Sequence, residues 1–416
     1  MLSKIKIDLK TLPLYLIYIA PTVHLAFGKR FGDLFNILTV LCLINIYKYG
    51  VEIPIKNKRL FFIFLITFFI YPLEIFISQL LRWQWRIHDY MDQIRFIFAF
   101  PVFLYLINKR VDLTKYIEYS IPVALILSFF TTKYLFSDTQ FGDRFTNNFT
   151  DPLAYGQICL SMSMLLIATF LYKNSSSYLK LYKVAGILFG IYISVKTESR
   201  TGWIAFPIAA LIIIYTFREK FNFRYIFLIF LSMLAICYGI YQTIDIVHLR
   251  LDQAFNELLS YPWHGGMAPE TSVGLRITFW RLGWFYITHN PWYGMGDKGF
   301  INLLNSQDIM SFASKEAITI SYQKLFHNEL ITQTVRYGLL GFIGYIAVLI
   351  IPFVIFFKEI NNPSNQIKHI SLITVIFLMS QIVAGVTDEV LNLKYMVLYF
   401  MLLMSISYSM LVRDEK

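Results

Sequence analysis

The chain has 416 residues, of which 57% are hydrophobic and 15% charged, and its formal net charge is +11. Soluble domains contain roughly 45–50% apolar and about 25% charged residues, so the composition excludes a soluble, disordered, collagen-like or disulfide-rich chain. The mean hydropathy of +0.56 indicates a polytopic membrane protein. The three cysteines lie in apolar runs and form no metal-binding pattern.

About twelve apolar runs are long enough to cross a bilayer as helices, which need roughly 17–25 residues each. The sequence therefore predicts an all-α, polytopic membrane protein with about 12 transmembrane helices. Their approximate positions are residues 12–28, 32–48, 60–80, 93–108, 116–132, 152–172, 181–196, 202–217, 225–241, 329–356, 369–386 and 393–412.

One connection, about residues 242–327, is much longer than the others. We therefore expect helices 1–9 within residues 1–241, a large outer loop over 242–327 and helices 10–12 within 328–416, all in one integrated domain. The loop contains an amphipathic helical stretch, 272–289, that suits the plane of the membrane interface. This stretch ends at His289-Asn290-Pro291, followed by a glycine-bearing turn.

Lysine and arginine occur mainly in alternate connections, and this bias sets the orientation of the chain in the membrane. These connections belong in the cytoplasm together with both termini. Their basic residues are Lys4, Lys6, Lys10, Lys48, Lys56, Lys58, Arg59, Lys109, Arg110, Lys115, Lys173, Lys180, Lys183, Arg218, Lys220, Arg224, Lys358, Lys368, Arg413 and Lys416. All seven tryptophans lie in or beside the opposite connections, where indole favours the interface. The positive charge is thus a topology signal, and nucleic-acid binding has no support.

The first span has a basic start but no small-residue cleavage site, so we interpret it as an uncleaved anchor.

On the outer side, Arg200 lies in a turn between two predicted spans. There, Ser199 or Thr201 is placed to cap the next helix. Because a helix N-terminus carries positive partial charge and free N–H groups, together with an arginine it suits an anion, phosphate in particular.

Three further arginines lie on the outer side, where the positive-inside rule disfavours them. Arg276 and Arg281 are five residues apart, about 140° around a helix, so we expect them to have different targets. Arg144 lies in the second-longest outer loop. Ordinary ion pairs or snorkelling side chains account for each arginine singly. Taken together, the arginines favour an anionic ligand at the outer membrane face.

His327 directly precedes the tenth predicted span. Since histidine takes up a proton near neutral pH, His327 is a candidate general base, and the alternative is a histidine that caps a helix. Asp388 and Glu389 lie in the last outer connection, where they could orient a base, pair with an arginine or form a solvated turn.

The sequence lacks the residue patterns that several other kinds of chemistry require. The seven histidines show no zinc spacing, and the chain has no P-loop and no glycine-rich dinucleotide motif. It also lacks a Gly-x-Ser-x-Gly elbow, and its outer loops lack an Asp-x-Asp pair. ATP-driven, NAD-linked and metal-dependent sugar-nucleotide chemistry are therefore disfavoured.

Four segments follow one another on the outer side. In chain order they are Asp143-Arg144 through Thr150-Asp151-Pro152 and Tyr155-Gly156, then Thr197-Glu198-Ser199-Arg200-Thr201-Gly202, then Thr271 to Arg276 continuing through Trp280 to His289-Asn290-Pro291-Trp292-Tyr293-Gly294-Met295-Gly296, and finally Phe326-His327-Asn328-Glu329-Leu330 through Gly338-Leu339-Leu340-Gly341. Across roughly residues 140–345 they resemble, in order and spacing, the O-antigen ligase/polymerase superfamily of bacterial inner-membrane glycosyltransferases. The N-terminal third is similar in hydropathy alone. The chain most resembles the lipid A–core:surface polymer ligases, which have a GT-C-like fold.

The resemblance implies a glycan donor on undecaprenyl pyrophosphate, a lipid A–core acceptor and a periplasmic active site, with no cofactor and no metal. Arg200 and Arg276 align with the family's donor-binding arginines, and His327 aligns with its essential histidine. His327 would deprotonate the acceptor hydroxyl in one inverting displacement. Arg144, Arg281 and Asp388 remain possible substrate contacts. The implied partners are these two lipids and the surrounding membrane lipids.

Three alternatives to a ligase remain open at this point. An O-antigen polymerase shares the donor, but such polymerases often have two large periplasmic loops, whereas one is expected here. Protein O-oligosaccharyltransferases often extend beyond the final span. A transporter or flippase usually places its charged residues at the membrane midplane and has repeated halves, and neither feature is present in this sequence.

Overall fold

The computed structural model describes residues 8–51, 57–91, 93–109, 111–137, 144–170, 176–218, 223–263, 265–322 and 326–413. These residues form helices and no strand, with only isolated bridges at Ser137–Asn147 and Asn147–Thr150. The predicted all-α, polytopic fold is therefore confirmed. Several predicted cytoplasmic basic residues lie outside the described residues, namely Lys4, Lys6, Lys56, Arg110, Lys173, Lys220 and Lys416.

In the described part of the chain, nine helical segments are long and apolar enough to cross a membrane. They are α2 (Phe31–Tyr49), α3 (Lys58–Arg82), Ile87–Asn108 with α4 (Ile94–Asn108), α5 (Leu113–Tyr134), α6 (Pro152–Phe170), α7 (Ser177–Lys196), Leu339–Glu359 with α16 (Leu339–Tyr345) and α17 (Ile351–Glu359), α18 (Asn365–Gly385) and α19 (Lys394–Val412). The other three predicted spans fall on α1 (Leu12–Phe27) and α8 (Ala205–Thr216), which are apolar but shorter, and on α9 (Phe223–Thr243), which is not among the nine.

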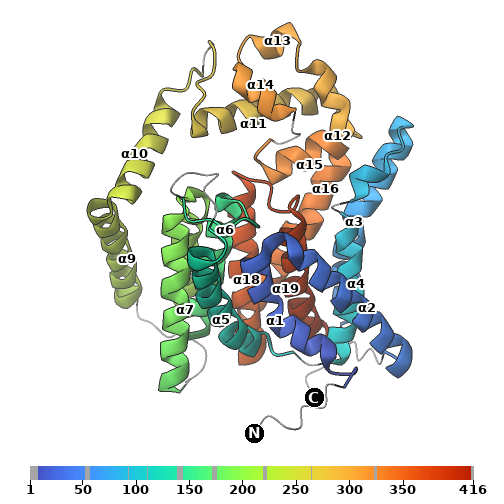
Figure 1. Cartoon of the computed structure of the whole chain (residues 1–416), viewed down its shortest axis with the longest axis vertical. Coiled ribbons are helices and arrows are strands. Elements are labelled where there is room, and N and C mark those ends of the chain that lie inside the picture. Colours follow the sequence, from blue (N-terminus) through green and yellow to red (C-terminus); the bar gives the residue numbers. More distant parts are fainter. Residues whose placement is uncertain are drawn as a thin grey trace.

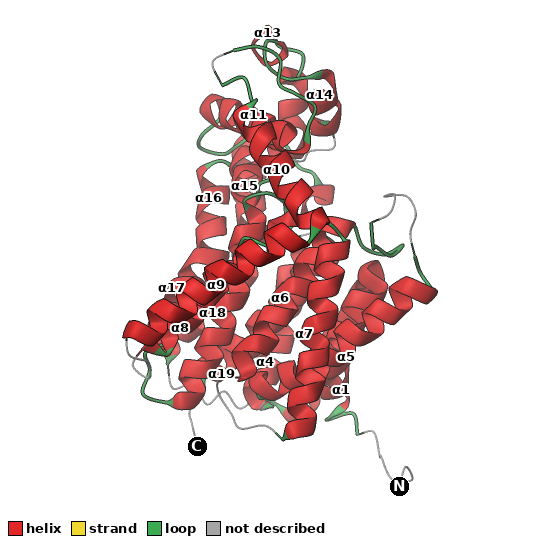
Figure 2. Ribbon diagram, turned by 90° about the vertical axis from the view of Figure 1, so that its left-hand side faces the viewer, coloured by secondary structure: helices red, strands yellow, loops and turns green. Residues whose placement is uncertain are grey.

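The centre of the bundle consists of α6, α18 and α19, in which most residues are buried, whereas a third or fewer of the residues of α2, α3 and α7 are buried. Glycines allow the closest helix contacts, as small residues commonly do in membrane bundles. A Cβ on Gly186 of α7 would lie 2.9 Å from Pro122 of α5, and one on Gly190 would meet Ser163 of α6. The start of α1 and the end of α19 lie at one end of this bundle (Figures 1 and 2).

The opposite end of the bundle carries the long outer loop (Figure 1). Its helices are α10 (Asp245–Leu259), α11 (Ser272–His289), α12 (Gly296–Gly299), α13 (Gln307–Met310) and α14 (Lys315–Ser321). The loop has a small hydrophobic core of its own, in which Phe279, Leu282 and Tyr286 of α11 pack with Phe300 and Phe326. The apolar face of α11 is therefore covered by protein, whereas the sequence pattern suggested a helix lying in the membrane interface.

The span predicted over residues 329–356 is interrupted in the structure. Gly338, with φ +64°, separates α15 (Glu329–Tyr337) from α16, and a π-helical turn (Ile346–Ile350) joins α16 to α17. The membrane-spanning segment consequently begins at Leu339, and α15 is a separate helix at the outer end of the bundle. Hydropathy alone conceals this break, because α15 is followed directly in sequence by the apolar segment that begins at Leu339.

The glycine turn after α11 packs directly against this break. The Met295 amide donates to the Val335 carbonyl at 2.9 Å, and the Leu339 amide donates to the Pro291 carbonyl at 2.8 Å. A Cβ on Gly294, which has φ +67°, would lie 2.5 Å from the backbone nitrogen of Gly338. The two glycines thus fix the outer loop to the membrane bundle by backbone contact.

Replacing Gly294 by alanine is expected to destabilise the protein by more than about 2 kcal/mol. A left-handed backbone costs an L-residue about 1–2 kcal/mol, and the clash with the backbone of α15 adds to this cost. Thermal unfolding in detergent measures the loss. Gly50→Ala is the matched control, since Gly50 has φ +71° and no atom within 4 Å of an added Cβ. An equal loss in both variants would contradict the close contact.

Candidate active site at the outer end of the bundle

Four arginines from separate segments gather where the outer loop meets the bundle. Burial lowers the pKa of Arg200, and the positive charges of Arg276, Arg250 and Arg144 lower that pKa further against the opposing charge of Glu257. Three of these arginines are candidates from the sequence, and Arg250 of α10 is an addition. Such a concentration of guanidinium groups favours an anionic ligand with several oxygens.

Glu198 holds two of the arginines in place. Its Oε2 atom lies 3.7 Å from Nε of Arg144 and pairs with Nη2 of Arg250. Arg200 is held through the backbone instead, since its Nη1 donates to the carbonyl of Arg250 at 2.8 Å. The Glu198 carboxylate therefore balances part of the positive charge of the arginine cluster.

The turn that carries Arg200 differs from the predicted helix cap. Helix α8 begins only at Ala205, and its N-cap residue, Ile204, provides no side-chain hydrogen bond. Ser199 is buried and donates to the carbonyl of Leu153 at 3.0 Å, so its hydroxyl fixes the turn to α6 instead of capping α8. The prediction that Ser199 caps the next helix is wrong, and Arg200 lies in a short 3-10 turn.

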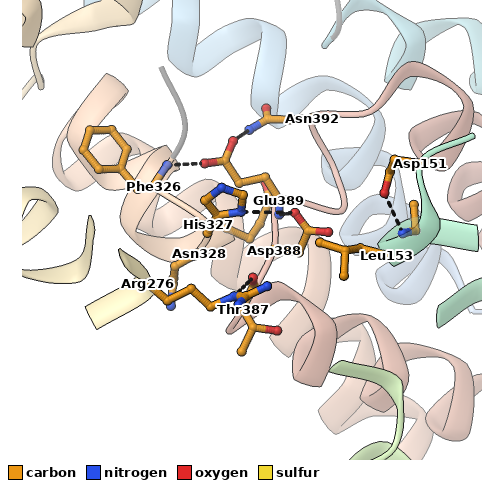
Figure 3. Close-up of polar contacts among 12 residues, drawn as sticks. Asp151, Leu153, Arg276, Phe326, His327, Asn328, Thr387, Asp388, Glu389 and Asn392 are labelled. Atoms are coloured by element: carbon orange, nitrogen blue, oxygen red, sulfur yellow. Dashed lines mark hydrogen bonds and ion pairs between the residues drawn. The ribbon is translucent and has the colours of Figure 1, made fainter. Parts of the chain in front are cut away.

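Arg276 lies in the first turns of α11 and reaches toward the last outer connection. Its Nε donates to the Thr387 carbonyl at 3.2 Å, and its Nη1 donates to the Ser272 carbonyl and hydroxyl at 3.0 and 2.6 Å. Burial lowers the pKa of Arg276, while the negative charges of Asp388 and Glu257 oppose that shift. Figure 3 shows the Arg276 side chain beside Thr387 and Asp388.

His327 lies in the tight connection before α15. Its φ of +48° is rare for a residue other than glycine, and such backbone strain is common at functional sites. Nδ1 is buried without a hydrogen-bond partner and lies 3.8 Å from Oδ1 of Asp388. The ring stacks on Phe279 with centroids 5.3 Å apart. Because Nδ1 faces the protein, Nε2 is the ring nitrogen left for a substrate (Figure 3).

Glu389 is buried and fixes the backbone around the histidine. Its Oε1 accepts from the Phe326 amide at 2.7 Å and from the Thr332 hydroxyl at 2.5 Å, and its Oε2 accepts from Asn392 at 2.6 Å. These contacts tie residue 326 and α15 to the last outer connection. The alternative of a solvated turn therefore does not apply to Glu389.

Asp151 lies directly before α6 and is a further acidic residue of the site. Its Oδ1 accepts from the Ala154 amide at 2.8 Å, and its Oδ2 accepts from the Tyr395 hydroxyl at 2.9 Å. Burial raises the pKa of Asp151, and the negative charge of Asp388 raises it further. The Asp151 and Asp388 carboxylates therefore interact electrostatically at this site.

Residues 184–346 match the family model described as O-antigen ligase. This match supports assignment of the chain to the O-antigen ligase/polymerase superfamily. An uncharacterized protein of Haemophilus influenzae is similar, with 25% identity over 333 residues that cover 79% of each chain. The matched family region contains Arg200, Arg250, Arg276 and His327, whereas Arg144 and Asp388 lie outside it.

The match supports a glycosyltransferase-type enzyme of O-antigen assembly, either a ligase or a polymerase. Lipid-linked glycans and lipopolysaccharide-type molecules are the substrates that this family implies. The apolar helices agree with a multi-pass protein of a family that resides in the bacterial inner membrane.

One predicted substrate contact, Arg281, lies outside the arginine cluster. Arg281 packs over the Phe312 ring at 4.2 Å, and its Nη1 donates to the Tyr261 hydroxyl at 3.3 Å. These contacts belong to the packing of the outer loop, on a different side of α11 from Arg276. Asp143, from the first of the four motifs, lies outside the described residues.

One group of potential metal ligands lies apart from His327. In the described part of the chain, His88, Asp89 and Asp297 bring one ligand atom each within 4.8 Å of one another. However, Asp297 Oδ1 is already paired with Nε of Arg336 at 3.0 Å. The guanidinium group neutralises this carboxylate, so the group forms an ion-pair network and has a poor donor set for a divalent cation.

Glu329 begins α15 beside the histidine of this enzyme and is completely buried. Its two carboxyl oxygens accept from Gln333 and from the Leu391 amide, each at 2.9 Å. Burial raises the pKa of Glu329 to about 7, and the negative charge of Glu389 acts in the same direction. The folded protein therefore binds a proton here that an unfolded chain releases at lower pH.

The stability of the protein is consequently expected to fall as the pH rises. An unfolded glutamate titrates near pH ~4.3, so the contribution of protonated Glu329 is complete below that value and is lost as the pH rises through about 7. The loss is on the order of 3 kcal/mol. Thermal unfolding between pH 5 and 8 should show a smaller slope for Glu329→Gln than for the unmodified protein. Equal slopes would contradict the assignment.

Proposed function

We propose that this protein is an O-antigen ligase that transfers a glycan from undecaprenyl pyrophosphate to a sugar hydroxyl of lipid A–core on the periplasmic face of the inner membrane. The observation that carries the proposal is the convergence of an arginine cluster and His327 at one end of the bundle, from segments far apart in the chain. Anion binding and proton acceptance are the two operations that this transfer requires.

The arginines would hold the donor pyrophosphate. Arg200 and Arg276 are the primary donor ligands in this proposal, with Arg144 and Arg250 adding positive charge. The planar guanidinium group matches phosphate oxygens with two parallel hydrogen bonds. Since negative charge grows on the pyrophosphate as its bond to the sugar breaks, fixed cations stabilise the transition state more than the ground state. The donor thus supplies its own leaving group, and no ATP is required.

His327 would act as the general base. The acceptor hydroxyl gives its proton to Nε2 while its oxygen forms a bond to the anomeric carbon. The bond from that carbon to the pyrophosphate oxygen breaks, and undecaprenyl pyrophosphate leaves with the electron pair. Attack opposite the leaving group inverts the anomeric configuration, in a single displacement that involves no metal and no cofactor.

The arrangement of the chain supports a periplasmic site. The start of α1 and the end of α19 lie at the end of the bundle opposite the outer loop (Figure 2). Lys115, Lys180, Lys358 and Lys368, predicted as cytoplasmic from the positive-inside rule, begin or end helices at the connections of the terminal end. We accordingly propose cytoplasmic termini and an active site on the periplasmic side.

Transfer in vitro tests this function. Purified protein is mixed with undecaprenyl-pyrophosphate glycan and lipid A–core, without ATP and with a metal chelator, and products are separated on a gel. We expect glycan on lipid A–core. Glycan that lengthens on undecaprenyl pyrophosphate while the core remains bare would identify a polymerase. Transfer to an added protein acceptor would identify a protein O-oligosaccharyltransferase, and movement of the donor across the vesicle membrane without transfer would identify a flippase.

A further inference from the structure

Asp388 lies near Arg276 and His327, which have different tasks in the proposed reaction. Its Oδ1 atom is 3.8 Å from Nδ1 of His327, too far for a hydrogen bond. On its other side, Arg276 donates through Nε to the carbonyl of the preceding residue, Thr387. Figure 3 shows the Asp388 carboxylate beside the imidazole of His327, with the Arg276 side chain close by. Asp388 thus interacts electrostatically with Arg276 and forms a long ion pair with His327, whose Nδ1 has no hydrogen bond.

The surroundings of Asp388 make a cationic partner necessary. Asp151 faces it from the start of α6, with its own carboxyl held by the Tyr395 hydroxyl of α19. Glu389 adds a second negative neighbour, which is fixed by the backbone of residue 326 and by Thr332. Because two acidic groups repel the Asp388 carboxylate, loss of one cationic partner increases its attraction to the other.

We propose that Asp388 is a positioning residue that couples donor binding to activation of His327. In the structure its negative charge partly balances the positive charge of Arg276. When the donor pyrophosphate binds the guanidinium group of Arg276, the Asp388 carboxylate moves to within hydrogen-bond distance of Nδ1 of His327. It then fixes the tautomer in which Nδ1 carries the proton and Nε2 faces the acceptor, and it stabilises the imidazolium that forms. This inference rests on the proposed function, in which Arg276 binds pyrophosphate and His327 is the base.

The coupling has an unusual consequence for a substitution of Asp388. Without the carboxylate, the donor pyrophosphate no longer competes with Asp388 for Arg276, so the donor should bind more tightly. His327 loses its partner, however, so turnover should fall. A residue that merely supports the fold would weaken binding and turnover together. The opposite signs of the two effects therefore distinguish a positioning role from a structural one.

The test measures both quantities for Asp388→Asn. Binding of undecaprenyl pyrophosphate without a glycan is measured first, because it needs no transfer, and we expect the dissociation constant to fall by roughly two- to fivefold. Turnover with the complete donor should fall roughly 10- to 100-fold. Asp308→Asn, at an exposed position of α13, is the matched control and should change nothing.

Each result has a distinct meaning. Weaker binding together with lower turnover, or turnover equal to that of the unmodified protein, would overturn the coupling. Asp388→Glu guards against a folding defect, because it retains the charge and should recover part of the turnover. Tighter pyrophosphate binding by Asp388→Asn in a protein without any transfer activity would support the pairing with Arg276, while the proposed ligase function would fail.

Discussion

Replacing His327 by alanine is expected to reduce glycan transfer by about 10²–10⁴-fold, the contribution that a general base typically makes. This corresponds to roughly 3–5 kcal/mol of activation free energy. Donor binding should change little, because the histidine faces Asp388 and Phe279 and no arginine of the cluster depends on it for a hydrogen bond. The transfer assay measures the first effect, and binding of undecaprenyl pyrophosphate measures the second.

His289→Ala is the matched control for this variant. His289 is an exposed histidine at the end of α11, in the same outer loop, and its Nδ1 contacts only the Phe285 carbonyl of its own helix at 2.7 Å. Normal transfer by His327→Ala would eliminate the general-base assignment. A loss of transfer in both variants would point to a disturbed loop and away from a chemical role for His327.

The hydrophobic pattern predicts the helices well, because a membrane leaves helical hydrogen bonding as the main way to satisfy the backbone. Each predicted apolar run falls on helical structure, although the run over 329–356 is divided among several helical segments. The pattern does not find the break at Gly338, whose reason is the contact with Gly294, more than forty residues earlier in the chain. A hydropathy profile records the apolar character of each segment and contains no information about such a contact.

The candidate site was predicted only where local motifs mark it. His327, Arg200 and Arg276 lie in short segments with recognisable neighbours, whereas Arg250 lies in the middle of a polar helix, where nothing in its neighbours sets it apart. Its role depends on the pairing with Glu198, a residue in a different segment of the chain. Asp151 had a signal, since an aspartate before a proline commonly begins a helix, but that signal predicts a cap and not a neighbour of Asp388.

Replacing Arg276 by glutamine is expected to lower kcat/KM by about 10²–10³-fold. Charge develops on the pyrophosphate oxygens as the glycosidic bond breaks, and removal of one fixed donor from such a site typically costs this much. Arg276 is half-buried on α11 and is held by Ser272 and Thr387, so its guanidinium group is already oriented. Steady-state transfer rates at several donor concentrations measure the effect on kcat and on KM separately.

Arg281→Gln is the matched control, because it makes the same substitution five residues further along the same helix. Arg281 packs on Phe312 and donates to Tyr261, so its loss should lower the unfolding temperature of the loop by a few degrees and leave kcat/KM within about threefold. Comparable losses of kcat/KM in both variants would show that the orientation of α11, and not the guanidinium group of Arg276, controls transfer. A loss confined to Arg276→Gln would instead assign the effect to the guanidinium group of Arg276, which interacts electrostatically with Arg200 within the cluster.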